Sequence, residues 1–229
     1  MNSRISVACT VTVNMKVLDI RNNFSPELAS KESALALLKG RAVVYPTDTL
    51  YALGVNIFDT EAIRKLFTIK KRPDRKPIPV IVGSISMAKA IAEIDKKREK
   101  VLKSFWPGPF TFILKKRPVV SYLLTAGRNT IALRIPDSTF CQMLVSDFEG
   151  PVTATSANIS GEETSQDPRE IIERFEREEC RPDLVVDAGV LPQSDPSTII
   201  DITGNMPKIL RINQTTKENL MNILKKMEF

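Results

Sequence analysis

Short, wholly apolar runs that follow helix-forming segments constrain the fold of this chain most. The run 42–44 shows no polar alternation, which is typical of a strand buried on both faces. The segment before it, 25–39, predicts a helix, because Ser25 can cap its start and Pro26 suits its first turn. A helix followed by a strand of this kind indicates an α/β fold with helices outside a sheet.

Helix and strand patterns continue to alternate along the 229 residues. Further helices are expected from Asp59 onward and over 84–94, 95–105, 137–148 and 167–178, with a last one starting near Thr215 or Thr216. Further strands are expected over 78–82, 110–114, 130–134, 152–155, 184–187, 197–201 and 208–211. The order lacks the regular repeat of a doubly wound fold, so we predict a single twisted mixed β-sheet flanked by helices. With no repeat or Gly/Ser linker, we expect one domain over 15–229 after an extension over 1–14.

The absence of histidine from the sequence limits the available chemistry. A Ser/His/Asp triad, a Cys/His pair and the usual histidine-ligated metals are excluded. Lys and Arg total 33 against 27 Asp and Glu, a net charge of +6. This excess fits an anionic ligand such as a nucleotide or RNA, and it fits general surface character equally well.

Cysteine spacing and hydropathy bear on the cellular compartment. Cys9, Cys141 and Cys180 lie far apart without CxxC spacing, so neither a zinc site nor a disulfide framework is expected. No apolar run approaches the roughly 18 residues of a membrane span, and the N-terminal stretch does not fit a secretory signal. We therefore expect a cytoplasmic protein without a membrane segment.

Three polar segments are candidates for a functional site. The segment 46–54 places three hydroxyls and a carboxylate after a buried strand, where ligands often bind, although a self-bonded turn is the alternative. The segment 70–77 holds five cations on a proline-restricted backbone, which suits a polyphosphate or is a solvated loop. The segment 151–161 is rich in small and hydroxyl side chains, which allow close ligand approach or cap a helix. Because no Walker phosphate loop or GxGxxG motif is present, a nucleotide must bind by another device.

Taken together, these segments in this order resemble the YrdC/Sua5 family of threonylcarbamoyl-adenylate synthases. The similar region covers about 16–211 and includes the segments 45–54, 70–77, 105–114, 130–136, 151–161 and 197–211. The resemblance implies a twisted mixed sheet flanked by helices around a large basic cavity. It also implies a nucleotidyltransferase that joins L-threonine, bicarbonate or CO2, and ATP for the threonylcarbamoyladenosine modification of tRNA.

The resemblance implies roles for particular residues. The KxR and SxN motifs imply catalytic roles for Lys70, Arg72, Ser156 and Asn158. Contacts with L-threonine are implied for Thr47, Arg134, the Ala154 backbone and Ser197. Contacts with ATP are implied for Arg72, Lys76, Thr130, Ser156, Thr164 and Arg211. One departure from the family pattern is Ile81, which stands where many members carry a histidine.

The implied reaction explains how a chain without histidine could be an enzyme. A carbamate formed from the threonine amine is already an anionic nucleophile, and its attack on the α-phosphate expels pyrophosphate. The protein then aligns the groups and stabilises phosphate charge. We expect Mg2+ to accompany ATP, although no acidic cluster identifies its ligands. The product is expected to pass to a tRNA threonylcarbamoyl-transferase, and direct contact with RNA or tRNA stays open.

Two alternatives remain. The first is a double-stranded RNA-binding module of the same fold, although the sequence lacks RNP-type aromatics and a KH loop. The second is a related enzyme that acts on carbamoyl phosphate, as in hydrogenase maturation, where this fold is joined to acylphosphatase and zinc-finger domains. Neither of those domains is found in this sequence.

Overall fold

The computed structural model describes residues 15–72, 76–214, 217, 218 and 220. Its helices are α1 (Pro26–Leu38), α2 (Thr60–Ile69), α3 (Ile85–Ile91), α4 (Lys96–Phe105), α5 (Thr139–Phe148) and α6 (Pro168–Glu176). Its strands are β1 (Lys16–Asp19), β2 (Val43–Pro46), β3 (Tyr51–Gly54), β4 (Val80–Ile81), β5 (Phe110–Lys115), β6 (Thr130–Arg134), β7 (Val152–Thr153), β8 (Thr155–Ser156), β9 (Leu184–Asp187), β10 (Thr198–Asp201) and β11 (Lys208–Arg211). The expected helix start near Thr215 and the extension over 1–14 lie outside the described residues.

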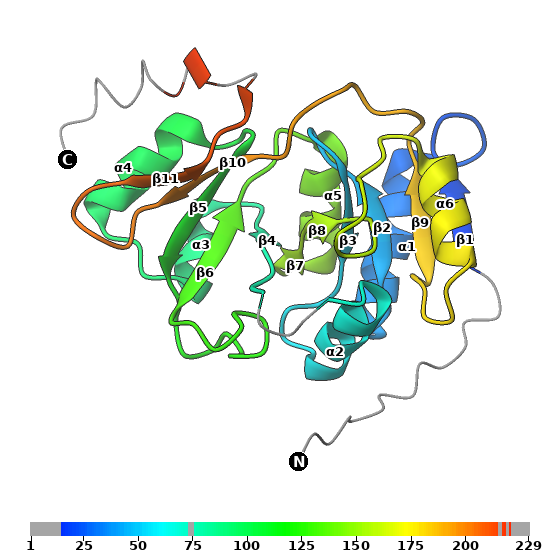
Figure 1. Ribbon diagram of the computed structural model, residues 1–229, viewed down its shortest axis with the longest axis horizontal. Coiled ribbons are helices and arrows are strands. Elements are labelled where there is room, and N and C mark those ends of the chain that lie inside the picture. The colour runs from blue at the N-terminus through cyan, green and yellow to red at the C-terminus, as the bar shows by residue number, and fades with distance from the viewer. Residues whose placement is uncertain (1–14, 73–75, 215–216, 219, 221–229) are drawn as a thin grey trace.

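The strands form two mixed sheets, with the orders β1-β9-β2-β3-β8 and β11-β10-β5-β6-β4-β7. Strand β2 is parallel to β9 and antiparallel to β3, while β5 is parallel to β10 and antiparallel to β6. Figure 1 shows the two groups of strands side by side along the long axis of the molecule. The mixed-sheet α/β fold predicted from the sequence is confirmed, but the expected single sheet is wrong, because the strands pair in two separate sheets.

The two sheets meet at Ala154, which separates β7 from β8 in the chain. The Ala154 N–H donates to the Pro79 carbonyl (2.8 Å), and the Thr153 N–H donates to the Val55 carbonyl (3.1 Å). Strand β7 pairs with β4 of the second sheet, whereas β8 pairs with β3 of the first. A single strand is predicted over 152–155, because nothing in that extended run indicates a change of pairing partner.

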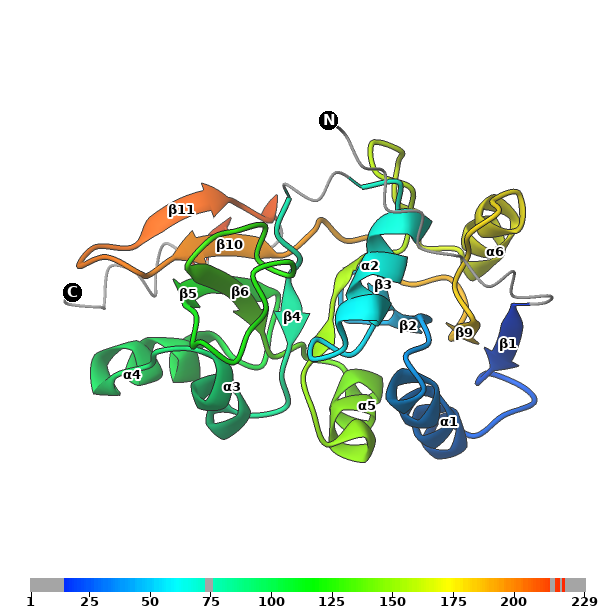
Figure 2. The same ribbon diagram turned by 90° about the horizontal axis from the view of Figure 1, so that it is seen from below.

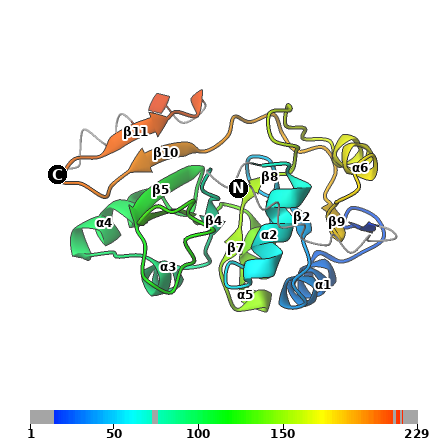
Figure 3. The ribbon, with the colours of Figure 1, turned by 60° about the horizontal axis from the view of Figure 1, so that its bottom comes forward.

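Helices cover both faces of the first sheet because side chains alternate along its strands. Val43 and Tyr45 of β2 pack in one cluster with α1 and α5, whereas Val44 packs in the other with α2 and α6. Figure 2 shows α1 and α5 beneath the first sheet and α3 and α4 beneath the second, and Figure 3 shows the same grouping. The run 42–44 is buried on both faces, as its apolar pattern predicts.

The expectations about membrane segments and cysteines can be compared with the described residues. Among the described residues, no helix has the length and hydropathy needed to span a bilayer. Cys141 is a free, buried thiol. Cys180, in contrast, is disulfide-bonded, which differs from the expectation of a chain without a disulfide framework.

Candidate active site

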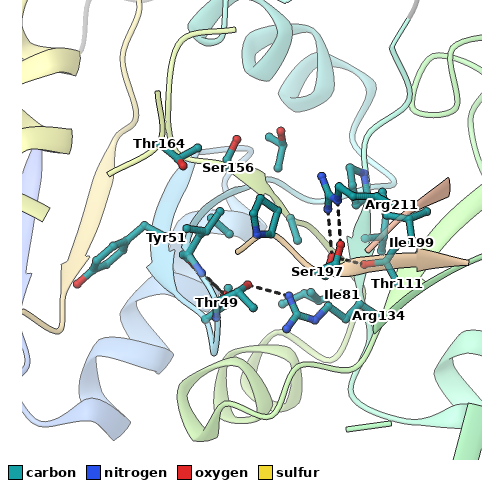
Figure 4. Close-up of a pocket in the computed structure, with 18 of the residues that line it drawn as sticks. Thr49, Tyr51, Ile81, Thr111, Arg134, Ser156, Thr164, Ser197, Ile199 and Arg211 are labelled. Carbon is teal, nitrogen blue, oxygen red and sulfur yellow. Dashed lines mark hydrogen bonds between the residues drawn. The ribbon is translucent and has the colours of Figure 1, made fainter. Parts of the chain in front are cut away.

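A cavity of about 390 Å³ lies where the two sheets meet, within the size range of small-molecule sites. Its walls come from the β2–β3 turn, β4, the β7–β8 junction, β10 and β11 (Figure 4). Nine of the sequence-predicted residues line it, namely Thr47, Arg72, Lys76, Arg134, Ala154, Ser156, Thr164, Ser197 and Arg211. The fold thus brings together most of the predicted site, from segments far apart in the chain.

Arg72, Lys76, Arg134 and Arg211 give this cavity four cationic side chains. Its described lining residues include no Asp or Glu. Burial lowers the pKa of Arg72 and Arg211 below the ordinary arginine value, and the charge of Arg134 adds to the effect at Arg211. Guanidinium groups keep their charge at neutral pH even so. An anionic ligand would relieve the repulsion among these partly desolvated cations.

Arg134, the last residue of β6, is held by three acceptors. Its Nε donates to the Gly108 carbonyl (2.9 Å), its Nη1 to Thr49 Oγ1 (3.0 Å) and its Nη2 to Asp48 Oδ1 (2.6 Å). Arg134 is only 8% exposed, so the Asp48 carboxylate compensates a charge that water barely solvates. The three bonds leave one N–H on each terminal nitrogen for a ligand, and such N–H groups suit a carboxylate.

The Thr47 hydroxyl stabilises the turn between β2 and β3. It donates to the Leu50 carbonyl (2.7 Å) and accepts from the N–H groups of Thr49 (3.1 Å) and Leu50 (3.2 Å). The self-bonded turn considered for this segment therefore describes Thr47, whereas Asp48 reaches across to Arg134. Thr47 also lines the cavity, and its contact with threonine stays a prediction.

Ser197 and Arg211 form a second polar group in the wall. The Ser197 hydroxyl lies 2.7 Å from Thr111 Oγ1, and Arg211 Nε donates to the Ser197 carbonyl (2.9 Å). Thr111 is buried in β5 and is not assigned by sequence reasoning. The available indication was a single hydroxyl within the apolar run 110–114.

Lys70 and Asn158 lie behind the cavity wall and are not among its lining residues. Lys70 is 1% exposed, and its Nζ donates to the carbonyls of Ser156 and Asn158 and to Asn158 Oδ1. The Ser156 hydroxyl donates to the same Asn158 Oδ1 (2.7 Å). Burial, and then the charge of Arg72, lowers the pKa of Lys70 to about 7. The KxR and SxN motifs are therefore in direct contact.

The remaining residues predicted to bind ATP divide between the cavity and its surroundings. Arg72 Nη2 donates to the Pro77 carbonyl (2.9 Å), which holds the guanidinium at the cavity. Thr130 begins β6 while Arg134 ends it, so the two lie roughly 13 Å apart along the strand. Thr130 is not among the lining residues, and its role in binding ATP stays a prediction.

The chain thus combines a mixed α/β fold with a cationic cavity at the junction of two sheets, an arrangement that suits a small anionic ligand. A family model, Sua5_yciO_yrdC, whose description reads "Telomere recombination", matches residues 35–212. The chain therefore belongs to the Sua5/YciO/YrdC family, as its motifs predict.

Relatives from an archaeon and a bacterium illustrate the similarity. Threonylcarbamoyl-AMP synthase of Pyrococcus abyssi is 34% identical over 81% of this chain and 54% of its own length. The crystal structure of P. abyssi Sua5 complexed with L-threonine has a TM-score of 0.83 at 29% identity, over 94% of this chain and 62% of that one. YciO of Escherichia coli is 35% identical over 76% of this chain and 83% of its own. Its crystal structure has a TM-score of 0.75 at 31% identity, over 88% of this chain and 96% of that one.

This chain spans a little over half the length of the P. abyssi synthase that it matches. The part that the family model matches, 35–212, contains every residue that lines the cavity.

Proposed function

We propose that this chain is an L-threonylcarbamoyladenylate synthase, which forms threonylcarbamoyl-AMP and pyrophosphate from L-threonine, bicarbonate or CO2, and ATP. The observation that carries the proposal is the composition of the cavity. Arg134 offers N–H groups for a carboxylate, while Arg72, Lys76 and Arg211 offer positive charge for phosphates. The similarity to a synthase and to a Sua5 structure complexed with L-threonine supports the same function.

The reaction requires placement and charge more than a strong base. The threonine amine and CO2 form a carbamate, whose oxygen attacks the α-phosphorus of ATP. The bond from that phosphorus to the bridging oxygen breaks, and pyrophosphate leaves with the electron pair. Arg134 holds the amino-acid carboxylate, and the other cations stabilise negative charge on the phosphates. Asn158 orients the Ser156 hydroxyl through its Oδ1 (2.7 Å) at the wall where ATP is expected.

Mg2+ belongs to this proposal as a companion of the triphosphate. Within the described part of the chain, no group of three or more His, Cys, Asp or Glu side chains could hold a metal ion. Phosphate oxygens and water satisfy the preference of Mg2+ for oxygen ligands. We therefore assign it no protein ligand.

The proposal extends to the fate of the product. A mixed anhydride with AMP is a reactive acyl donor, so we propose that a tRNA threonylcarbamoyl-transferase consumes it. We place the reaction in the cytoplasm, where ATP and tRNA are both available, and treat direct tRNA contact by this chain as a question for binding measurements. The proposed catalytic domain is 15–229, with 1–14 as an extension.

The test is pyrophosphate release from ATP and bicarbonate with each amino acid in turn, with mass detection of the adenylate. We expect release that depends on threonine and a product with the mass of threonylcarbamoyl-AMP. Release that depends on another amine would keep the chemistry and change the substrate, which the similarity to E. coli YciO makes worth testing. Absence of release with every amino acid contradicts the proposal, and tight binding of double-stranded RNA would then favour the RNA-binding module.

A further inference from the structure

The Asp48 carboxylate joins parts of the molecule that are distant in the chain. Asp48 lies in the turn between β2 and β3 of the first sheet. Its Oδ1 accepts from Arg134 Nη2 (2.6 Å) at the end of β6 in the second sheet. Its Oδ2 accepts from the Asp137 N–H (3.1 Å), just before α5. One side chain therefore connects the two sheets beside the cavity.

Both members of the Asp48–Arg134 ion pair are shielded from water. Their side chains are 13% and 9% exposed, respectively. Burial, and then the charge of Arg134, lowers the pKa of Arg211, so the two cations repel each other across the cavity. Asp48 supplies the opposite charge that keeps Arg134 stable in this position before a ligand arrives.

Asp48 also determines the direction of the Arg134 guanidinium. The group is planar, and its three acceptors come from two separate segments: Asp48 and Thr49 in the β2–β3 turn, and Gly108 before β5. Of these acceptors only Asp48 is charged, and charge-assisted hydrogen bonds are roughly twice as strong as neutral ones. Figure 4 shows Arg134 directed toward Thr49 among the lining residues. Loss of the carboxylate would therefore release the strongest of the three restraints.

We propose that Asp48 is the positioning residue for the carboxylate of the amino-acid substrate. It holds Arg134 so that the N–H groups not used by protein acceptors face the ligand. Asp48 is not among the lining residues and acts through Arg134. The identity of the ligand as an α-amino acid rests on the proposed function, whereas the orientation of Arg134 does not.

The first test is equilibrium binding of L-threonine and of threoninol, in which a hydroxymethyl group replaces the carboxylate. We expect Asp48→Asn to weaken L-threonine binding on the order of 100-fold, because a misdirected guanidinium loses the carboxylate. Binding of threoninol and of ATP should be unchanged. Asp48→Glu, which keeps the charge but lengthens the side chain, should weaken L-threonine binding less. Asp95→Asn is the matched control, since Asp95 pairs with Arg98 on α4, away from the cavity.

The second test observes the Arg134 guanidinium directly by ¹⁵N NMR. In the wild type the ion pair should slow rotation about the Cζ–Nη bonds and give separate Nη–H signals, assigned by their loss in Arg134→Lys. Asp48→Asn should average these signals. If Asp48→Asn does not fold, Asp48→Glu carries the test, because its longer side chain should shift the signals and weaken binding of L-threonine but not of threoninol.

The two tests separate this inference from the proposed function. Averaged guanidinium signals in the wild type, or full L-threonine binding by a folded Asp48→Asn variant, would overturn the positioning role. A third outcome is that the wild type gives separate signals, that Asp48→Asn averages them, and that the wild type does not bind L-threonine. This outcome would reject threonine as the substrate and retain the role of Asp48 in orienting Arg134.

Discussion

Lys70 illustrates how a motif residue can support a site from behind. The three acceptors of its ammonium group all belong to residues 156 and 158, and an ammonium group has three N–H donors to satisfy them. Its lowered pKa reflects the burial that this arrangement requires. The contacts indicate that Lys70 shapes the wall that carries Ser156, and a direct contact with substrate is not needed for that role.

Replacing Lys70 tests this supporting role. Lys70→Met would remove one donor from each of three oxygens, although the Ser156 carbonyl keeps the Asn158 N–H and Asn158 Oδ1 keeps the Ser156 hydroxyl. We expect a loss of about 1–3 kcal/mol in the free energy of unfolding, with reduced adenylate formation. Above the folded pKa of about 7 and below the ordinary value of 10.5, the unfolded chain binds a proton that the folded chain releases. The stability of the wild type relative to Lys70→Met should therefore rise with pH across this window, as urea unfolding at several pH values can measure. An unchanged unfolding midpoint in the variant would contradict the supporting role.

Arg72 differs from Lys70, because it lines the cavity and forms no ion pair among the described residues. We expect Arg72→Ala to lower the rate of adenylate formation on the order of 100-fold or more, since one donor to the developing phosphate charge is lost. Its thermal unfolding should resemble that of the wild type. Arg177→Ala, at an exposed position that does not line the cavity, is the control. Wild-type turnover by Arg72→Ala would remove Arg72 from the phosphate-binding set.

The residues of the site could be predicted from the sequence only in part. Local reasoning identified the segments that contain Thr47, Arg72 and Ser156 but left a structural alternative for each, and the family resemblance was needed to place them in one site. Asp48 is an ordinary turn residue by its spacing, and its partner Arg134 lies 86 residues away. Such a pairing is a property of the folded chain, which explains why no sequence pattern indicates it.

At the scale of helices and strands, pairing partners explain most departures from the expected boundaries. The helix expected over 84–94 ends at Ile91, because Ala92 is extended and forms a bridge with Lys116. The segment 51–54, considered only as part of a ligand loop, forms β3, since it pairs with β2 and β8. Helix starts were more predictable, and Ser25 accepts from the Leu28 N–H as expected of a cap.

Strand β3 also contains a position where close packing excludes a side chain. A Cβ at Gly54 would lie 2.6 Å from Tyr45 Cε1 and 2.7 Å from Val152 Cγ1. We expect Gly54→Ala to destabilise the fold by about 1–3 kcal/mol, because β3 would have to move away from its neighbours. Urea unfolding measures the change. Gly204→Ala, where a Cβ would have no neighbour closer than 3.9 Å, is the control, and equal stability of the two variants would refute the packing argument.

At the scale of the whole molecule, the alternation of helices and strands was sufficient to predict a mixed α/β fold. The division into two sheets was not predictable, because it depends on which strands β7 and β8 contact on either side of Ala154. The cavity lies at that division. The position of the cavity therefore depends on which strands pair in the folded chain, and no single segment of the sequence predicts it.

The charge of the cavity predicts how ligands stabilise the molecule. ATP at 100 times its dissociation constant should raise the free energy of unfolding by about 2.7 kcal/mol. The shift in melting temperature at a fixed ligand concentration should decrease from ATP to AMP to adenosine, and added salt should reduce it, because the phosphates supply the attraction to the cationic residues. Thermal unfolding with each ligand measures this order. Equal stabilisation by adenosine and ATP would contradict phosphate recognition by this cavity.

The cavity draws its walls from the β2–β3 turn near the start of the domain and from Arg211 at the end of β11. During synthesis on a ribosome, a chain that has not yet emerged as far as Arg211 lacks part of the site, even if its earlier strands have paired. The complete ligand site of a nascent chain can therefore form only after translation has passed β11.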